Sequence, residues 1–277
     1  MKKKVLIIGG GASGLMAAIM AAREGAEVTI LEHMDRVGKK ILSTGNGRCN
    51  MTNLSVRPEY YRSSQKLFPM KVLDRFSVWD TLNFFDGIGI VTKNRNGYIY
   101  PNSDQAASVL DALRFETEHL GIQTVLSCHI KKAWKAKNGM FTVESDQGLF
   151  QGNSLILAAG SKAAPVSGSD GSGYELAGSF GHTIVKPLPA LVQLRCRGTF
   201  FKQLAGVRCE AVVRLVSNGK TLAADEGEVQ LTDYGISGIP TFQVSRYAAR
   251  VLDEGRQVSA LLDFFPSKSM EDTRTML

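Results

Sequence analysis

The sequence predicts an α/β fold that opens with a strand–helix–strand unit and continues into a β-rich segment. Three observations support this prediction. A β-branched apolar run at 5–8 precedes a glycine-rich turn and an Ala-, Leu- and Met-rich helix. Short apolar runs then recur between helical stretches, which is typical of α/β domains. Beyond Pro187 and Pro189, strand-like runs dominate. We therefore expect two domains, residues 1–186 and residues 187–277.

Composition is that of an ordinary globular protein. The chain has 277 residues, 44% hydrophobic and 21% charged, enough to bury a core without disulfides or metals. Its four cysteines are widely scattered and show no CxxC spacing, so the sequence predicts neither a zinc site nor a redox dithiol. The four histidines are also dispersed, and we expect no metal centre.

The net charge of +7 suits an anionic partner such as a phosphate-bearing cofactor. The basic residues show no regular interleaving with aromatic residues, so the composition disfavours nucleic-acid binding. No apolar run approaches the roughly 20 residues of a membrane span. Glycines break the apolar stretch after the N-terminal lysines, which excludes a signal peptide. We expect a cytoplasmic protein with a small-molecule substrate, and the sequence does not indicate its oligomeric state.

The first elements form one βαβ unit. Val5 to Ile8 reads as a buried strand, Gly9 to Gly14 as a turn, and Leu15 to Arg23 as a helix that Gly25 ends. Val28 to Leu31 is the second strand, with Glu32 at its end. The connection is expected to be right-handed.

The middle of the chain alternates loops and helices. Residues 33–57 form a long polar loop, which in a compact domain is usually functional. Residues 58–86 indicate two or three short helices, and we expect most of their aromatic rings to pack in the core. Ser103 is expected to cap a helix that runs to about Leu120, with Asp104 in its first turn.

The later elements complete the first domain and build the second. A strand at 122–125 precedes a three-stranded meander at 127–152, in which Asn138 and Gly139 predict a hairpin turn. Another buried strand runs to Ala159 and ends at Gly160. The remaining expected elements are a helix at 172–180, strands at 191–195, 209–216 and 227–231, a helix at 239–254 and a strand at 258–264.

The glycine-rich turn carries the functional prediction. Residues 9–14 read G-G-G-A-S-G, a GxGxxG that follows a strand and opens a helix, and Glu32 closes the next strand. In such a fingerprint the glycines allow a tight turn, a close approach of the backbone to a pyrophosphate, and close helix packing. The backbone N–H groups near Ala12 and Ser13 would face the phosphates, and Glu32 would bind the ribose hydroxyls. The sequence therefore predicts a Rossmann-type dinucleotide site containing Gly9, Gly11, Ala12, Ser13, Gly14 and Glu32.

Two features favour FAD over NAD as the resident dinucleotide. The fingerprint lies at the very N-terminus, and a meander and a strand ending at Ala159 and Gly160 come later, where many flavoproteins contact their cofactor again. Ile130, in the first strand of the meander, belongs to the same expected cofactor-binding set. No second strand–GxGxxG–helix occurs, which is compatible with tightly held FAD and a transient reductant, NADH or NADPH.

Residues 38–53, G-K-K-I-L-S-T-G-N-G-R-C-N-M-T-N, closely resemble the signature of the BaiN-like (YhiN-like) flavoproteins, which are NAD(P)/FAD-dependent oxidoreductases. Weaker matches follow at 97–105, 157–161, 181–194 and 231–238, so the resemblance covers nearly the whole chain. It implies a Rossmann-type FAD-binding domain with a β-rich, barrel-like domain inserted into it. Since family members run well beyond 277 residues, it also implies that this chain ends inside the inserted domain.

The resemblance implies further candidate residues. Lys39 or Lys40 would neutralise the pyrophosphate or lie at the flavin edge where negative charge develops, although residue type alone favours a solvated pair. Arg48 would bind a phosphate or a substrate carboxylate, and Asn50 the flavin or its ribityl chain, with bonding inside the loop as the equal alternative. Cys49 and Tyr234 are catalytic candidates. For each of them, packing without a catalytic role is the commoner case. As a catalytic residue, Tyr234 would donate a proton during the reduction of an alkene.

The sequence and the resemblance together predict an FAD-dependent oxidoreductase in which NAD(P)H delivers hydride to flavin N5 and N5 passes it to an enone or similar activated alkene. Two alternatives stay open. One is a flavin-dependent amine oxidase. The other is a flavin-binding or RNA-associated protein without turnover, or an inactive fragment, which the basic charge and the short chain would suit.

Overall fold

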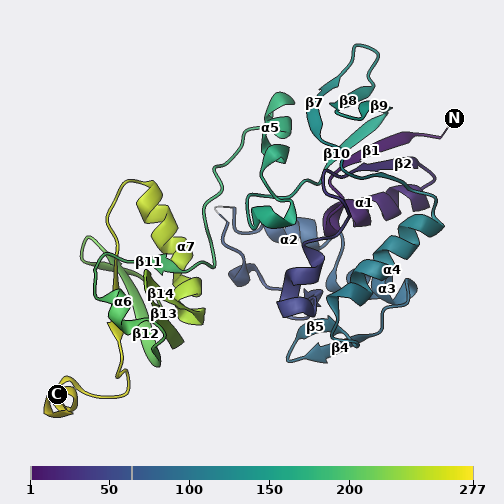
Figure 1. Ribbon diagram of the computed structural model, residues 1–277. Coiled ribbons are helices and arrows are strands. Elements are labelled where there is room, and N and C mark those ends of the chain that lie inside the picture. Colours follow the sequence, from purple (N-terminus) through teal and green to yellow (C-terminus); the bar gives the residue numbers. More distant parts are fainter. Residues whose placement is uncertain (1, 64, 277) are drawn as a thin grey trace. The chain divides into compact units, whose positions relative to one another are not determined.

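The computed structural model describes residues 2–63 and 65–276. The chain divides into two compact units, Met1–Val185 and Lys186–Leu277. Figure 1 labels the elements of both units. Among the described residues, no helix has the length and apolar character needed to cross a bilayer.

A parallel four-stranded sheet organises the first unit (Figure 1). Its strands are β1 (Lys4–Ile8), β2 (Glu27–Leu31), β6 (Gln123–Val125) and β10 (Ser154–Leu157). They lie in the order β10-β1-β2-β6. Ile8 pairs with Leu31 on one side and with Leu157 on the other, so these three strands end level with one another. Residues that follow the three strands therefore meet at one sheet edge, where open α/β sheets bind ligands.

Two helices, α1 (Ala12–Arg23) and α4 (Ala106–His119), pack with this sheet in one core. Apolar residues on α1 recur at helical spacing, which gives the helix one face to bury. The Arg23 guanidinium binds the Glu116 carboxylate at 2.7 Å and ties the two helices together. The central buried side chains of this core are Ile7, Leu15, Ile19, Ile30, Val109 and Leu113.

A second core lies on the opposite side of β1, because alternate residues of a strand point to opposite faces. Leu6 and Ile8 pack there with Ala133 and Val143 of the meander. The meander consists of β7 (Ile130–Lys135), β8 (Phe141–Ser145) and β9 (Gly148–Gly152), and α5 (Ser172–Ser179) packs beside it. Gly139 lies in the turn between β7 and β8 with φ 83°, as the sequence indicates.

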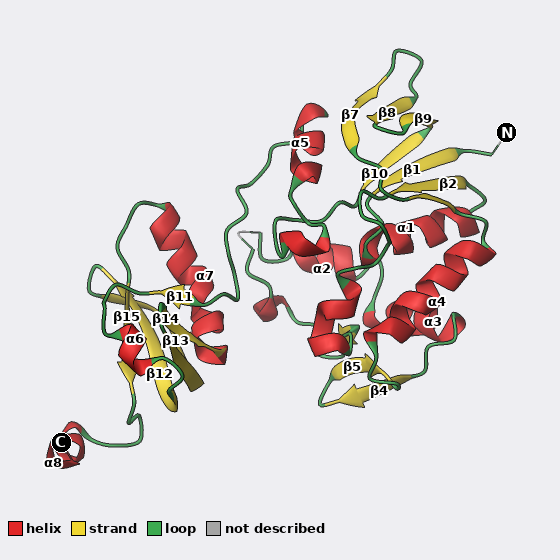
Figure 2. Cartoon of the chain, in the orientation of Figure 1, coloured by secondary structure: helices red, strands yellow, loops and turns green. Residues whose placement is uncertain are grey.

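Between β2 and α4 the chain forms short elements (Figure 2). They are the 3-10 segment η1 (Ile41–Gly47), β3 (Thr52–Asn53), η2 (Pro58–Tyr60), α2 (Phe68–Leu73), α3 (Val78–Gly87), β4 (Thr92–Arg95) and β5 (Tyr98–Pro101). Strands β3, β5 and β4 form a small antiparallel sheet that pattern analysis missed, because β4 reads T-K-N-R and has no apolar alternation. A further 3-10 turn, η3 (Pro165–Ser167), lies in the loop after β10.

The expected cap at Ser103 is wrong. Helix α4 begins at Ala106, after Gln105, and no side chain caps it. Asp104 lies outside the helix with φ 55°, and its carboxylate binds Lys93 at 2.5 Å and Arg95 at 2.6 Å. These two ion pairs attach the start of α4 to β4, and they hold Asp104 in a left-handed conformation that cannot begin a helix.

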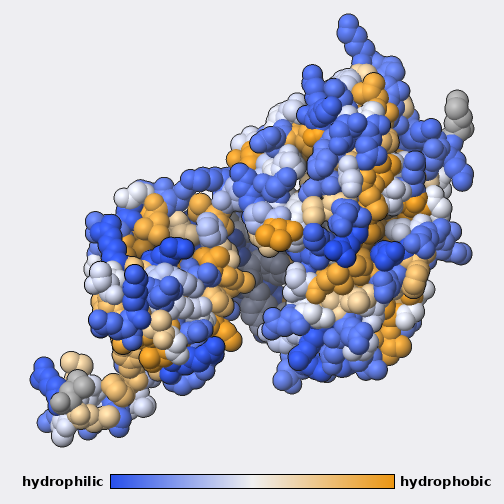
Figure 3. Space-filling view, in the orientation of Figure 1, coloured by the Kyte–Doolittle hydropathy of each residue, from blue (hydrophilic) through white to orange (hydrophobic). Residues whose placement is uncertain are grey.

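The expectation that most rings in residues 58–86 pack in the core is also wrong. Phe84 is buried, but Phe76 and Trp79 are exposed, and Tyr60, Tyr61 and Phe68 are exposed as well. Short elements cause this outcome, since η2 and the six-residue α2 offer too little continuous surface to cover a ring on every side. Figure 3 shows apolar surface interspersed among polar side chains.

The second unit is an antiparallel sheet packed against one long helix (Figure 2). Its elements are β11 (Leu194–Arg195), α6 (Phe201–Leu204), β12 (Arg208–Ser217), β13 (Lys220–Thr232), β14 (Gly235–Gly238), α7 (Ile239–Asp253), β15 (Ser259–Asp263) and α8 (Met270–Met276). The strand order is β11-β14-β13-β12-β15. Val213 and Val229 of the sheet pack against Val244 and Ala248 of α7. The expected α/β class, a Rossmann-type unit with a meander and a β-rich segment, is confirmed.

Candidate dinucleotide site

A cavity of about 340 Å³ lies at the edge where β1, β2 and β10 end. Three segments of the first unit form its walls. One is the turn between β1 and α1, the second follows β2, and the third follows β10. The cavity is lined, among others, by Gly9, Gly11, Ala12, Ser13, Glu32, Lys39, Lys40, Ala159 and Gly160. All nine are residues that sequence analysis assigns to the cofactor.

Close packing explains two glycines of the turn. Gly9 has φ 103°, and a Cβ there would lie 2.5 Å from the Ala158 carbonyl oxygen. A Cβ on Gly14 would lie 1.9 Å from the Gly9 carbonyl oxygen. Neither contact is possible between real atoms, so the turn and the start of α1 can approach β10 only with glycine at both positions.

Gly11 is different, since a Cβ there would meet no atom within 4 Å. Its backbone is extended, with φ −76° and ψ −172°, and it is the N-cap residue of α1. No side chain caps this helix, and the first internal bond runs from Leu15 N–H to the Gly11 carbonyl at 2.9 Å. The N–H groups of the first turn therefore face the cavity beside open space, an arrangement that suits a bound anion.

Glu32 is buried, with 7% of its surface exposed, and lies at the end of β2. One carboxylate oxygen accepts the Gly10 N–H at 2.6 Å, and the other accepts the Met34 N–H at 2.8 Å. These charge-assisted bonds fix the glycine turn against the segment that follows β2. Glu32 thus has a structural role that the fingerprint alone does not disclose.

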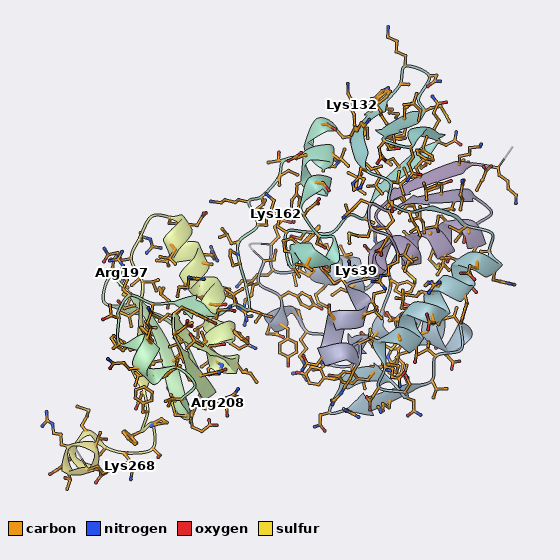
Figure 4. All side chains as sticks on the ribbon, in the orientation of Figure 1. Lys39, Lys132, Lys162, Arg197, Arg208 and Lys268 are labelled. Carbon is orange, nitrogen blue, oxygen red and sulfur yellow. The ribbon has the colours of Figure 1, made fainter. Side chains whose placement is uncertain are left out.

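The two lysines of the signature block differ in their contacts. The Lys40 ammonium donates to the Ala163 carbonyl oxygen at 2.5 Å and to the Ser169 hydroxyl at 2.6 Å, both in the loop after β10. Lys39 lines the same cavity, and within residues 2–63 and 65–276 its ammonium makes no such hydrogen bond to the loop after β10. Figure 4 labels Lys39, together with Lys162 of the loop after β10.

Ile130 lines a neighbouring cavity of about 360 Å³, which shares Gly9 and Ala159 with the first. The rings of His33 and His129 lie there with their centroids 6.2 Å apart. The region that the meander contributes therefore adjoins the glycine turn.

Cys49 and Asn50 line a third cavity, of about 330 Å³, whose wall shares Ala12 with the first. Burial raises the pKa of the Cys49 thiol, and a hydrogen bond with Thr44 opposes the shift. The thiol is therefore held protonated, which disfavours a nucleophilic role. Arg48 is exposed and lines none of these three cavities. The pKa of the Asp104 carboxyl is lowered mainly by the hydrogen bond from Lys93, and the positive charge of Arg48 adds to this lowering.

Tyr234 belongs to the second unit, in the turn between β13 and β14. It is half-buried, its carbonyl accepts the Cys196 N–H at 2.9 Å, and the Arg195 guanidinium lies 5.5 Å from its ring centroid. Among the described residues, no group of three or more His, Cys, Asp or Glu side chains could hold a metal ion.

The loop after β10 contributes Ser167, Gly168 and Ser169 to the cavity wall, and none of the three was predicted from the sequence. The only available signal was the glycine-rich stretch to which they belong, and this stretch does not directly follow a predicted strand. His33 was missed as well, although its position next to Glu32 is a usable signal.

Comparison with known proteins identifies relatives along the chain. The family model described as "HI0933-like protein Rossmann domain" matches residues 3–250. A 3-dehydro-bile acid delta(4,6)-reductase of Clostridium scindens is 45% identical over 273 residues, which is 98% of this chain and 66% of the relative. Ribosomal RNA dihydrouridine synthases of Haemophilus influenzae and Escherichia coli are each 29% identical, over 87% of this chain and 61% and 60% of their own lengths.

The chain thus spans about three fifths to two thirds of these relatives. The resemblance found from the signature block is confirmed. Because the family model covers most of the residues, this chain belongs to the HI0933-like family, whose Rossmann domain it contains.

Proposed function

We propose that this chain belongs to a flavin-dependent reductase and holds FAD in the 340 Å³ cavity of its first unit. The observation that carries the proposal is the uncapped N-terminus of α1 facing open space beside Gly11, with Lys39 lining another wall of the same cavity. A pyrophosphate needs N–H donors, positive charge and room for a close approach, and this site supplies all three.

The remaining residues fit the two ends of the cofactor. Glu32 lies at the end of β2, where an acidic residue accepts hydrogen bonds from the adenosine ribose. Ile130 adjoins the same end of the site. Asn50 lies beyond Ala12, on the side where the flavin and its ribityl chain would extend. Lys39 would neutralise the pyrophosphate, and Ala159 and Gly160 close the opposite wall.

Bound FAD would accept hydride from NADH or NADPH and deliver it from N5 to an electron-poor alkene carbon. The residues of the chain orient the cofactor and supply charge. The Tyr234 hydroxyl is our candidate to protonate the carbon next to the one that receives hydride, which completes the addition of two hydrogen atoms.

The names of the relatives point to one substrate class. A delta(4,6)-reductase of a 3-dehydro-bile acid saturates double bonds conjugated with a ketone, and a dihydrouridine synthase saturates the uracil ring, whose double bond is conjugated with a carbonyl. Both reactions are reductions of an alkene that a carbonyl group activates. We infer that the same reaction type applies here, with a steroid-like enone favoured by the 45% identity.

The test is anaerobic oxidation of NADPH or NADH with a steroid 4-en-3-one, followed by mass spectrometry. The proposal expects substrate-dependent cofactor oxidation and a product heavier by two hydrogen atoms. Oxygen consumption that an amine drives in the absence of NADPH and NADH would instead identify an amine oxidase.

A second candidate is reduction of uridine in RNA. Two relatives named for that activity and the excess of 33 basic over 26 acidic residues support it. Incubation with ribosomal RNA and a reduced nicotinamide would give dihydrouridine, detected as a nucleoside two mass units heavier. RNA that stays unmodified while the steroid is reduced would remove this candidate.

A further inference from the structure

The loop at 160–171 makes up most of the connection from β10 to α5 and forms one wall of the dinucleotide cavity through Ser167, Gly168 and Ser169. Most of its remaining residues face solvent, and Val166 is 88% exposed. A segment this exposed has little apolar burial to hold it in place, so its few fixed contacts decide how often it opens.

Lys40 makes the principal polar contact between this loop and the segment after β2. Its ammonium binds the Ala163 carbonyl oxygen at 2.5 Å and the Ser169 hydroxyl at 2.6 Å, from 123 and 129 residues away. Ser169 is only 8% exposed, so its hydroxyl is held on the inner side of the loop. Lys40 itself lines the cavity, and the contact therefore joins two of the three cavity walls.

The two neighbouring lysines consequently differ in what they can do for a bound dinucleotide. Lys40 has two of its three donors engaged by the loop. Lys39 shares the cavity without such a contact within the described part of the chain. One lysine is placed to hold the wall, and the other to meet the phosphates.

We propose that Lys40 is a positioning residue that latches the 160–171 loop over the dinucleotide site through Ser169 and Ala163, so that it controls how fast the cofactor leaves, whereas Lys39 provides the charge that binds it. This inference rests on the proposed function for the identity of the ligand. The latch itself consists of contacts within the chain, so it can be tested without a bound dinucleotide.

Opening of the loop can be followed with trypsin, because Lys162 lies in the loop and is exposed. Trypsin would cleave the peptide bond between Lys162 and Ala163 once the loop opens. We would measure the rate of cleavage after Lys162 in the chain without FAD, and the rate of FAD release after reconstitution. The variants are Lys40→Met, Ser169→Ala and, as a control that removes the same charge outside the latch, Lys39→Met.

Lys40→Met is expected to raise both rates about tenfold and Ser169→Ala about threefold, the range for the loss of two hydrogen bonds or one. Lys39→Met is expected to leave cleavage unchanged, weaken FAD binding, and reduce its dependence on salt. Ser169→Ala matters most, because it alters the latch without altering charge.

Cleavage of Ser169→Ala and Lys40→Met at the rate of the unmodified chain would overturn the latch. An equal increase in the cleavage rate of Lys39→Met would also overturn the latch, since the loss of a positive charge, and not the loss of the loop contacts, would then explain the faster cleavage. If the unmodified chain takes up no FAD, the proposed function fails, while the cleavage rates still decide whether the latch exists.

Discussion

The two units place their polar groups in different ways. In the first, parallel strands end level with one another, so Gly9, Glu32 and Ala158 come together at one edge although they are far apart in sequence. In the second, antiparallel strands run past one another, and polar side chains pair across the sheet, as Arg208 and Glu228 do at 2.8 Å. The carboxyl-terminal edge of a parallel sheet brings polar groups together into one binding site, whereas an antiparallel sheet has its polar groups spread along its strands.

This difference assigns separate tasks to the two units. We expect changes at the sheet edge of the first unit to alter cofactor retention, and changes at the β13–β14 turn of the second to alter turnover alone. Four substitutions test the separation, from the largest expected effect to the smallest.

Gly11→Val should abolish FAD retention while the chain stays folded. The backbone at Gly11 is extended and a Cβ there meets no atom within 4 Å, so a valine side chain would occupy the space proposed for the pyrophosphate. The pyrophosphate would then lose charge-assisted bonds from the N–H groups of the first turn of α1. Loss of two such bonds predicts at least about a 100-fold weaker affinity for FAD. Titration with FAD and a thermal melt would measure the two properties.

The matched control is Gly14→Ala, whose Cβ would strike the Gly9 carbonyl oxygen and lower stability. Unimpaired FAD binding by Gly11→Val would show that the dinucleotide lies elsewhere.

Glu32→Ala should lower the free energy of unfolding by about 2–4 kcal/mol, because it leaves the buried N–H group of Gly10 and the partly buried N–H group of Met34 without acceptors. Urea denaturation measures the change. Glu27→Ala removes an exposed carboxylate paired with Lys4 and should cost less than about 0.5 kcal/mol. Equal effects of the two substitutions would show that Glu32 does not hold the glycine turn.

Tyr234→Phe should reduce turnover about tenfold or more and leave FAD retention unchanged, because only the hydroxyl of a residue in the second unit is lost. Steady-state reduction of the enone gives turnover, and the visible spectrum gives retention. Tyr247→Phe, on α7 of the same unit, is the control and should change neither. Full activity of Tyr234→Phe would remove it as the proton donor.

Cys49→Ala should lower stability by about 1 kcal/mol and leave reduction of the substrate intact. Burial raises the pKa of this thiol, so the folded chain favours the protonated form. The resulting stability is fully present below the unfolded pKa of about 8.5 and is lost as the pH rises through the folded value. Alkaline denaturation curves should therefore converge for the two proteins, and a large loss of turnover would restore Cys49 as a catalytic residue.

The glycine turn could be predicted from sequence because most of its constraints lie within one strand–helix–strand unit. Gly14 approaches the Gly9 carbonyl oxygen of the same turn, and Glu32 ends the next strand of the same unit, whereas the contact of Gly9 with Ala158 is with a distant segment. A fingerprint of this kind carries its own geometry. The signature block likewise identified Lys39 and Lys40, but not how their contacts differ.

The rest of the site depends on pairs that no local pattern records. Ser169 contacts a lysine 129 residues away, and Asp104 leaves its expected helix to bind Lys93 and Arg95 across a hairpin without apolar alternation. Trp79 lies in the first turn of α3 and is exposed, although its residue type favours the core. Such outcomes arise from tertiary packing, which overrides local propensity.

The most direct test of the account is the visible absorption spectrum of the chain, mixed with FAD and then desalted, beside Gly11→Val treated in the same way. Retained bands near about 370 and about 450 nm in the unmodified chain alone are the predicted result, since these bands mark oxidised flavin. A folded but colourless unmodified chain would contradict the account, because the glycine turn, Glu32 and Lys39 would then not hold the cofactor.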